Sequence, residues 1–311
     1  MPLEGWEDLH VLAESLAQAA VTGILMGGLF ALMSVGLGLI FGMMRVINFA
    51  QPEFMMLGMY AAFFTVAALG GMGFAGPFLT PVIGAAAAAI AVGLFGWLVH
   101  RLLLSRVRGE RAQDTQIILT LGVSLLLQNG ALMAFGADPL TIRTPISARA
   151  WTVGEVFVNQ AKSLACLVSV ACAAGLYLFM SRSRLGRAMR AAADNPEAAT
   201  YMGIDVARAQ RTGFALGIAL TAAAGGMVAM FTPFQPYVGL DFLILMYASV
   251  VLGGLGSINA AFWGGMTIGL VQQLSSVFVP IQLQNMVVFV AFLLIVILRP
   301  NGLFGRSAER I

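Results

Sequence analysis

The longest uncharged stretch of the chain is residues 242–298, which read FLILMYASVVLGGLGSINAAFWGGMTIGLVQQLSSVFVPIQLQNMVVFVAFLLIVIL. It contains no Asp, Glu, Lys or Arg. A helix needs about 20 consecutive apolar residues to cross a lipid bilayer. Glycines between Gly253 and Gly256, and Pro280 further on, interrupt the stretch, so it holds two full crossings, or three if the first is short. These residues therefore predict membrane helices.

Five more runs without a charged residue precede this stretch. They are residues 15–44, 54–100, 115–137, 163–181 and 212–240. The second run holds two crossings, because the glycines around Gly71 and the pair Gly76-Pro77 interrupt it. The six runs predict nine crossings, or eight if residues 242–260 re-enter the membrane instead of crossing it. We therefore expect one all-α domain, residues 1–311, built as a polytopic transmembrane bundle of eight or nine helices with broken or re-entrant segments.

The composition agrees with a membrane protein. Of the 311 residues, 59% are hydrophobic and 10% are charged, whereas about 25% are charged in a soluble domain. The mean hydropathy is +0.90. These values exclude an ordinary soluble enzyme, a disordered chain and a secreted disulfide scaffold. Cys166 and Cys172 lie inside an apolar run and indicate neither a disulfide framework nor a metal site.

The positive charges indicate the topology, because Lys and Arg collect in cytoplasmic loops. Of the 17 Lys and Arg residues, all but Arg143, Arg149 and Lys162 fall in loops that we assign to the cytoplasm. These cytoplasmic cations are Arg45, Arg101, Arg106, Arg108, Arg111, Arg182, Arg184, Arg187, Arg190, Arg208, Arg211, Arg299, Arg306 and Arg310. Residues 1–14 carry four acids and no cation. The N-terminus is therefore predicted outside and the C-terminus inside, which requires an odd number of crossings.

Several catalytic and cofactor-binding patterns are missing from the sequence. A nucleotide-binding phosphate loop needs Gly-Lys-Ser/Thr, but the one lysine, Lys162, follows Ala161. The two histidines, His10 and His100, cannot form an H-E-x-x-H zinc site and lie at predicted span ends. We therefore expect no catalytic residue, metal or cofactor in this chain, and no hydrolysis of ATP by it.

The predicted cytoplasmic loop at residues 182–211 contains the signals of a short helix. Asn195 suits the N-cap, Pro196 the first helical position, and Glu197 the positive end of the helix dipole. Gly203 suits a left-handed stop, and Asp205 can cap the following membrane helix. The loop is either a docking element for a cytoplasmic partner or a solvated basic loop with a chance helix.

These residues resemble a known motif. Glu197-Ala198-Ala199 followed by Gly203 matches the E-A-A-x-x-x-G coupling motif of ABC importer permeases. The wider stretch LGRAMRAAADNPEAATYMGI, residues 185–204, is similar to the coupling loop of branched-chain amino acid permeases of the LivH type. Residues 38–60, 120–129 and 250–265 agree with that family as well. The sequence departs from it at Gln51-Pro52, where His-Gly is usual, and at Asn259, where Pro is common.

The resemblance implies a permease subunit of an ABC importer in the bacterial inner membrane. It implies a second permease subunit, two ATP-binding cassette subunits that bind ATP and Mg²⁺, and a periplasmic substrate-binding protein, with the lipid bilayer around the chain and no nucleic acid. The implied substrates are branched-chain or other small apolar amino acids, moved by alternating access. The implied ATPase-coupling residues are Asn195, Pro196, Glu197, Ala198, Ala199 and Gly203. The alternative function is a secondary transporter or channel for small neutral solutes such as urea or amides.

Polar breaks between apolar runs are the candidates for a translocation path. Irregular backbone at membrane depth is tolerated only where it faces protein or water. The break after Arg45 is either a turn on the inner side of the membrane or part of such a path. If Glu53 lies deep in the membrane, its charge needs a partner such as Arg45. The glycine-rich break at residues 253–259 is its counterpart in the second half. The candidate path residues are Asn48, Gln51, Glu53, Gln128, Ser257 and Asn259.

Pairs of glycines four residues apart predict close helix packing. They are Gly23/Gly27, Gly213/Gly217 and Gly265/Gly269.

Overall fold

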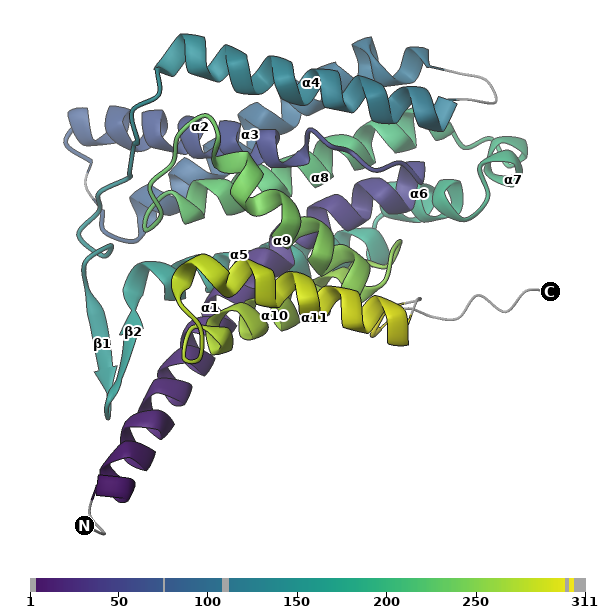
Figure 1. Cartoon of the computed structure of the whole chain (residues 1–311). Coiled ribbons are helices and arrows are strands. Elements are labelled where there is room, and N and C mark those ends of the chain that lie inside the picture. The colour runs from purple at the N-terminus through teal and green to yellow at the C-terminus, as the bar shows by residue number, and fades with distance from the viewer. Residues whose placement is uncertain (1–3, 75, 108–111, 300–301, 305–311) are drawn as a thin grey trace.

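The computed structural model describes residues 4–74, 76–107, 112–299 and 302–304, and this part of the chain is a bundle of α-helices with one small hairpin (Figure 1). The long helices are α1 (Glu4–Met44), α2 (Gln51–Gly71), α3 (Leu79–Leu102), α4 (Ala112–Phe135), α5 (Gln160–Arg182), α8 (Val206–Val228), α9 (Val238–Gly253), α10 (Ile258–Ser275) and α11 (Gln284–Leu298). The short helices are α6 (Arg184–Asp194), α7 (Pro196–Tyr201) and two 3₁₀ turns, Leu104–Arg106 and Ile281–Leu283. The strands β1 (Ala150–Val153) and β2 (Val156–Asn159) pair antiparallel.

The long helices run back and forth between two ends of the molecule (Figure 1). One end carries α6 and α7, and we call it the α7 end. The other end carries β1 and β2, and we call it the hairpin end. Helix α1 begins at the hairpin end and α11 finishes at the α7 end (Figure 1). Within the described residues, the beginning of the first helix and the end of the last one therefore lie on opposite sides of the bundle.

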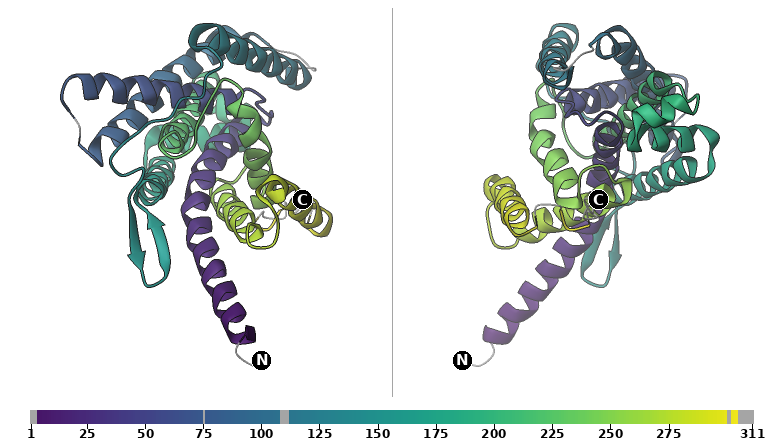
Figure 2. Two further views of the ribbon diagram at one scale, coloured as in Figure 1. Left: turned by 60° about the vertical axis from the view of Figure 1, so that its left-hand side comes forward. Right: turned by 90° about the vertical axis from the view of Figure 1, so that its right-hand side faces the viewer.

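Helix α1 lies in the middle of the bundle. Figure 2 shows it between α5 and α8 on one side and α9, α10 and α11 on the other. Its most extensive contacts are with α10 and α8. Small residues make this packing close: a Cβ atom added at Gly269 would collide with the backbone of Gly27, and one added at Gly265 would collide with Ala31. Since a Cβ at Gly217 would meet Gly36 O at 2.5 Å, the predicted role of the paired glycines in close packing is confirmed.

The uncharged stretch at residues 242–298 contains three helices, α9, α10 and α11. Helix α9 has 16 residues, α10 has 18 and α11 has 15, extended by the preceding 3₁₀ turn. The backbone turns at Gly254 and Gly256, whose φ angles are +122° and +88°, values open to glycine and costly for other residues. Seven described helical segments are long and apolar enough to cross a membrane, and α9 is a shorter apolar helix. The chain is therefore an all-α, multi-pass membrane protein, as predicted.

The hairpin end differs from the sequence-based expectation in two ways. Helix α1 begins at Glu4 instead of near residue 15 and extends beyond the rest of the bundle (Figure 1). The loop at residues 138–162 contains β1 and β2, joined through Gly154, whose φ is +62°. Gln18 of α1 donates its side-chain amide to Phe157 O at 2.9 Å and accepts from Phe157 N at 2.8 Å. These two bonds pair backbone groups at the edge of the hairpin with a side chain far away in the sequence, which no local pattern reveals.

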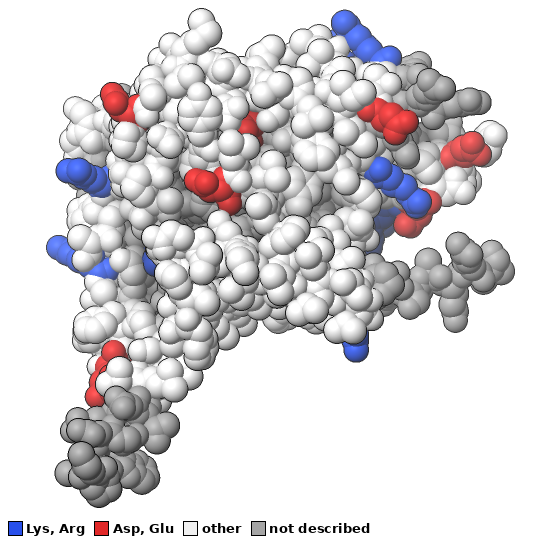
Figure 3. All heavy atoms as spheres, viewed as in Figure 1, with Lys and Arg blue, Asp and Glu red and all other residues white. Residues whose placement is uncertain are grey.

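Charged side chains are sparse on the face seen in Figure 3. Lys and Arg lie toward its two ends, whereas the middle is almost entirely uncharged apart from a few acidic atoms. Such a band suits a bilayer-spanning protein. The predicted cytoplasmic cations Arg108, Arg111, Arg306 and Arg310 lie outside the described residues.

Close packing of α1 on α10 predicts that Gly269→Ala lowers the midpoint of thermal unfolding (Tm) in detergent. The added methyl group has to displace the backbone of α1, and overpacking costs about 1–3 kcal/mol. Gly122→Ala in α4 is the matched control, because a Cβ there meets nothing within 4 Å and Ala favours helix over Gly by about 0.5–1 kcal/mol. A Gly269→Ala protein at least as heat-stable as Gly122→Ala would contradict the close contact.

Candidate coupling segment and translocation path

The segment between α5 and α8 is built from consecutive capped helices. Asn195 Oδ1 accepts from the backbone N–H of Ala198 at 3.0 Å, and Pro196 follows as the first residue of α7. Gly203 has a φ of +79°, and the next amide, Ile204 N, donates to Ala199 O at 3.0 Å. The predicted cap, first turn and left-handed stop are therefore all present. Asp205 caps α8 as predicted, with its carboxylate accepting from Arg208 N at 2.9 Å.

Helix α6 precedes α7 and was not predicted. It buries Gly186, Met189 and Ala192 on one face and packs on α5, α8 and α1. A Cβ added at Gly186 would lie 2.5 Å from Phe179 O of α5, so glycine allows the two helices to meet. The spacing of three residues between these small and apolar positions is the signal that could have revealed α6. Because α5 ends at Arg182 and α8 begins at Val206, the segment outside the long helices is shorter than the predicted 182–211.

Helix α7 presents most of its surface to solvent at the α7 end. Ala199 is buried, whereas Pro196, Glu197 and Ala198 are exposed. Tyr201 and Met202 follow directly, with 87% and 82% of their surface exposed. Two large apolar side chains that stay exposed beside a rigidly capped helix are typical of a contact surface for another protein.

The break between α1 and α2 carries polar side chains into the bundle. Arg45 ends α1 with a φ of +54°. Asn48 and Gln51 are buried, with Asn48 Nδ2 donating to Gln51 Oε1 at 3.0 Å. Gln51 Nε2 then donates to Thr221 Oγ1 of α8 at 2.6 Å, and Tyr247 donates its hydroxyl to Asn48 O at 2.7 Å. This cluster joins the break to α8 and α9 and satisfies polar groups that lipid could not.

Glu53 lies level with the middle of α4. Ser124 Oγ donates to Glu53 Oε1 at 3.4 Å, and Ser124 is at the middle of the α4 span Asp114–Phe135. The side chain is 2% exposed, and its Oε2 has no hydrogen-bond partner among the described residues. A charge at this depth costs about 2.5–3.5 kcal/mol on insertion scales. Arg45, the partner expected for a deep Glu53, instead lines a cavity at the α7 end.

Gln128 lies one turn beyond Ser124 on α4 and is buried. Its Nε2 has no hydrogen-bond partner within the described part of the chain. Four of the candidate path residues therefore lie in the interior, between the break and α4. They are Asn48, Gln51, Glu53 and Gln128.

The two remaining candidates lie elsewhere. Ser257 and Asn259 line a cavity of about 1140 Å³ at the α7 end, together with Arg45 and residues of α5 and α6. Ser257 also caps α10, accepting from Ala260 N at 3.4 Å. The tertiary structure thus divides the predicted path residues between an interior cluster and a cavity at one end.

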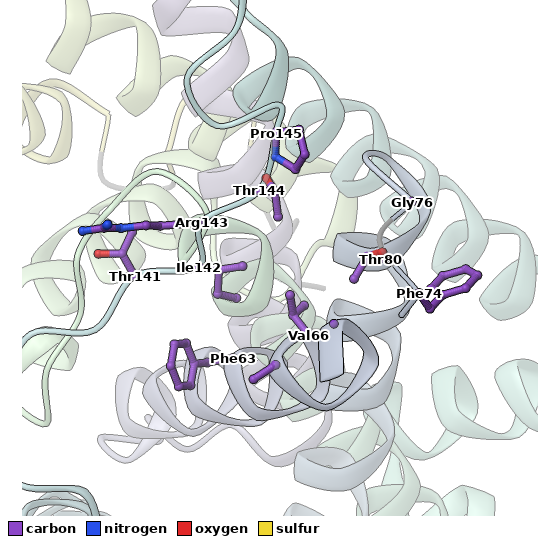
Figure 4. Close-up of a pocket in the computed structure, with 12 residues that line it drawn as sticks. Phe63, Val66, Phe74, Gly76, Thr80, Thr141, Ile142, Arg143, Thr144 and Pro145 are labelled. Carbon is purple, nitrogen blue, oxygen red and sulfur yellow. The ribbon is translucent and has the colours of Figure 1, made fainter. Parts of the chain in front are cut away.

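A second, smaller pocket lies at the hairpin end. Its volume is about 390 Å³, and it lies between α2, the start of α3 and residues 141–145. Figure 4 shows Phe63 and Val66 on one side of it and Thr80 on another, with the Arg143 side chain beside Thr141. The pocket is mostly apolar and contains none of the predicted path residues.

These features are suited to transport. No group of three or more His, Cys, Asp or Glu side chains able to hold a metal occurs in the described residues. The capped and exposed helix α7 suits contact with another protein. The polar break between α1 and α2, which lies beside the middle of α4, suits the passage of a solute. Together they define a multi-pass membrane transport protein.

Comparison with known proteins agrees with this class. Residues 19–298 match the family described as branched-chain amino acid transport system / permease component, and the chain belongs to that family. It is 29% identical to the high-affinity branched-chain amino acid transport system permease protein LivH of Escherichia coli K12, covering 93% of this chain and 95% of the relative. It is 30% identical, with the same coverage, to the corresponding protein BraD of Pseudomonas aeruginosa PAO1.

A third relative matches over a smaller part of the chain. A probable branched-chain amino acid transport permease protein LivH of Methanocaldococcus jannaschii is 30% identical over 81% of this chain and 78% of its own length. No solved structure matches the chain.

The bond between Gln51 and Thr221 predicts that Thr221→Val destabilises the protein. The substitution keeps the shape but leaves a buried Gln51 donor unpaired, which costs about 1–3 kcal/mol, so we expect a lower Tm. Thr65→Val is the matched control. Each threonine hydroxyl donates to the backbone carbonyl four residues earlier, at 3.1 Å for Thr221 and 2.7 Å for Thr65. The Thr65 hydroxyl, however, makes no bond to another helix in the described structure. Equal Tm values for the two variants would show that the interhelical bond contributes nothing.

Proposed function

We propose that the chain is the permease subunit of an ABC importer for branched-chain or related small apolar amino acids. The observation that carries the proposal is the capped α7, exposed at one end and tied through α6 to three membrane helices. Family membership supports the same function. ATP and Mg²⁺ would be bound by two partner ATPase subunits, because this sequence contains no phosphate-binding loop.

The proposed orientation places the α7 end in the cytoplasm and the start of α1 in the periplasm. The support is the distribution of Arg along the chain, since cytoplasmic loops are rich in Lys and Arg, together with the positions of the two helix ends (Figure 1). A periplasmic substrate-binding protein would then meet the hairpin end. A second permease subunit would complete the pathway.

The proposed solute path passes the interior cluster around Gln51 and Glu53 and reaches the cavity lined by Ser257 and Asn259. The residues Asn48 and Gln128 belong to the same interior cluster. Alternating access would follow from movement of α7: because α6 contacts α1, α5 and α8, a displacement at α7 shifts the helices that surround the break.

The coupling proposal predicts that Gly203→Pro uncouples transport. Proline fixes φ near −65° and removes the backbone N–H, whereas Gly203 has a φ of +79° and donates to Thr200 O at 3.0 Å. Glu197→Lys should act in the same direction, because it places a positive charge at the positive end of α7. We expect ATP-driven uptake in vesicles to fall by about tenfold or more, the scale of a coupling free energy, with normal membrane insertion.

Gly136→Pro provides the control for backbone strain. Gly136 ends α4 at the hairpin end, also with a φ of +79° and with an amide that donates to Leu132 O at 3.0 Å. We expect this variant to retain ATP-driven uptake, because it lies away from α7. Normal uptake by both Gly203→Pro and Glu197→Lys would overturn the coupling role.

Purification of the tagged chain from its own host tests the assembly. The importer predicts that two ATPase subunits, a second permease and a binding protein accompany it, as identified by mass spectrometry. A chain that is purified alone and conducts solute without ATP would instead favour the secondary transporter or channel.

A further inference from the structure

The end of α3 and the start of α8 bring two arginines to one tryptophan. Trp97 and Arg101 lie one turn apart on α3, and Arg211 lies in the second turn of α8. The guanidinium carbon of Arg101 is 5.3 Å from the centre of the Trp97 ring, and that of Arg211 is 5.4 Å from the same point. Both distances are within the range of a cation–π contact. Two positive charges are therefore held beside one aromatic ring.

The packing of α3 on α8 positions this group. Contacts between these two helices are among the most extensive in the bundle. A Cβ atom added at Gly93 would be 2.9 Å from the Cβ of Ala219, whereas Trp97, one turn later on α3, meets Arg211, two turns earlier on α8. The helices are therefore antiparallel, and their close contact places both arginines at the α7 end of the pair.

The two guanidinium groups have no anionic partner within the part of the chain that the structure describes. Neither Arg101 nor Arg211 forms a salt bridge with a described carboxylate, and the side-chain Nε of Arg211 is buried without a hydrogen-bond partner. A buried donor without a partner is costly, and like charges beside one another repel. An anion bound to this pair would relieve both costs.

The surroundings of the pair indicate which anion fits. Leu94, Leu98 and Leu102 follow each other at intervals of one turn on α3, and all three are exposed. Such a stripe on a membrane helix suits contact with acyl chains. Arg101 is exposed next to Leu102, and Trp and Arg at the end of a membrane helix lie at the level of the lipid headgroups. An acyl-chain surface that ends at two cations matches a phospholipid with a negatively charged headgroup.

We propose that Trp97, Arg101 and Arg211 form a binding site for the phosphate headgroup of an anionic phospholipid. The planar guanidinium presents several N–H donors in a geometry that matches phosphate oxygens. The acyl chains of the bound lipid would lie along the leucine stripe of α3. Basic pockets between membrane helices are suited to such headgroups. This site goes beyond the proposed transport function, and it depends neither on the transported solute nor on the ATPase subunits.

Quenching of Trp97 fluorescence by brominated lipids tests the site. The full-length chain, with Trp97 as its one tryptophan, is placed in vesicles of phosphatidylglycerol and phosphatidylcholine, and one of the two lipids is brominated near the headgroup end of its acyl chains. We expect anionic phosphatidylglycerol to bind beside Trp97 about tenfold or more tightly than zwitterionic phosphatidylcholine. The background substitutions are Trp6→Phe, Trp151→Phe and Trp263→Phe.

Charge removal separates this site from general attraction of anionic lipid. Arg101→Gln and Arg211→Gln should each lower the preference for phosphatidylglycerol by about fivefold, the scale on which one basic residue attracts an anionic membrane. Arg182→Gln is the matched control, because Arg182 is also exposed in the last turn of a membrane helix, α5. It should leave the preference unchanged. Quenching by brominated phosphatidylcholine as strong as in the parent verifies that each variant is inserted.

Inorganic phosphate distinguishes a lipid headgroup from a soluble anion. Added at an ionic strength matched with chloride, it should not displace brominated phosphatidylglycerol from Trp97. Displacement by inorganic phosphate, equal binding of the two lipids, or an unchanged preference in both Arg101→Gln and Arg211→Gln would overturn the lipid site. A loss of preference in Arg182→Gln as large as in the two site variants would overturn it as well. Equal binding of the two lipids would point instead to an acidic segment of a partner subunit.

Discussion

A polar group inside a bilayer has no water to bond with, so each one has to be satisfied by the protein or face an aqueous space. The break between α1 and α2 illustrates this constraint. The chain leaves α1 at Arg45 and enters the bundle without helical hydrogen bonds. Side chains then supply backbone partners: Tyr247 donates its hydroxyl to Asn48 O, Asn48 Oδ1 accepts from Ala50 N, and Thr120 Oγ1 accepts from Phe49 N. Gln51 adds a side-chain bond to Thr221 of α8. Three helices are tied together at this point, and the arrangement of the interior follows from it.

The same constraint explains why α9 is short. Residues 229–237 return from the hairpin end into the bundle, where Phe234 exchanges two backbone hydrogen bonds with Leu140, each of 2.9 Å. The helix that follows starts against Glu53 and spans only part of the bilayer, since 16 residues extend about 24 Å. Two helices therefore begin at mid-depth, and their dipoles favour the acids in their first turns.

Close packing connects this interior to the α7 end. Glycines let α1 approach α10 and α8 without intervening side chains, and Gly186 does the same for α6 on α5. Helices in such contact move together, because a displaced backbone has no free space beside it. The short capped helix α7 contacts α6, which in turn contacts α1, α5 and α8, and our proposed coupling uses these contacts.

The membrane class, the caps of α7 and the presence of polar breaks could be predicted from the sequence alone. The expected eight or nine crossings compare with seven described helical segments that are long and apolar enough to span a bilayer. These features follow from local properties: runs without charge, residues with fixed cap or turn preferences, and Arg on the flanks. Asn195, Pro196 and Gly203 could be interpreted correctly because capping involves only neighbours along the chain. The amphipathic α6 had a local signal too, in the spacing of Gly186, Met189 and Ala192.

The contacts between residues that are far apart in the sequence could be found from the three-dimensional structure alone. The depth of Glu53, its contact with Ser124 instead of Arg45, and the start of α9 beside it join residues far apart in the sequence. The hairpin depends on Gln18 in the same way, since its edge is paired by a side chain more than a hundred residues earlier. Such contacts result from the packing of whole helices, whose relative rotation and depth no local pattern specifies.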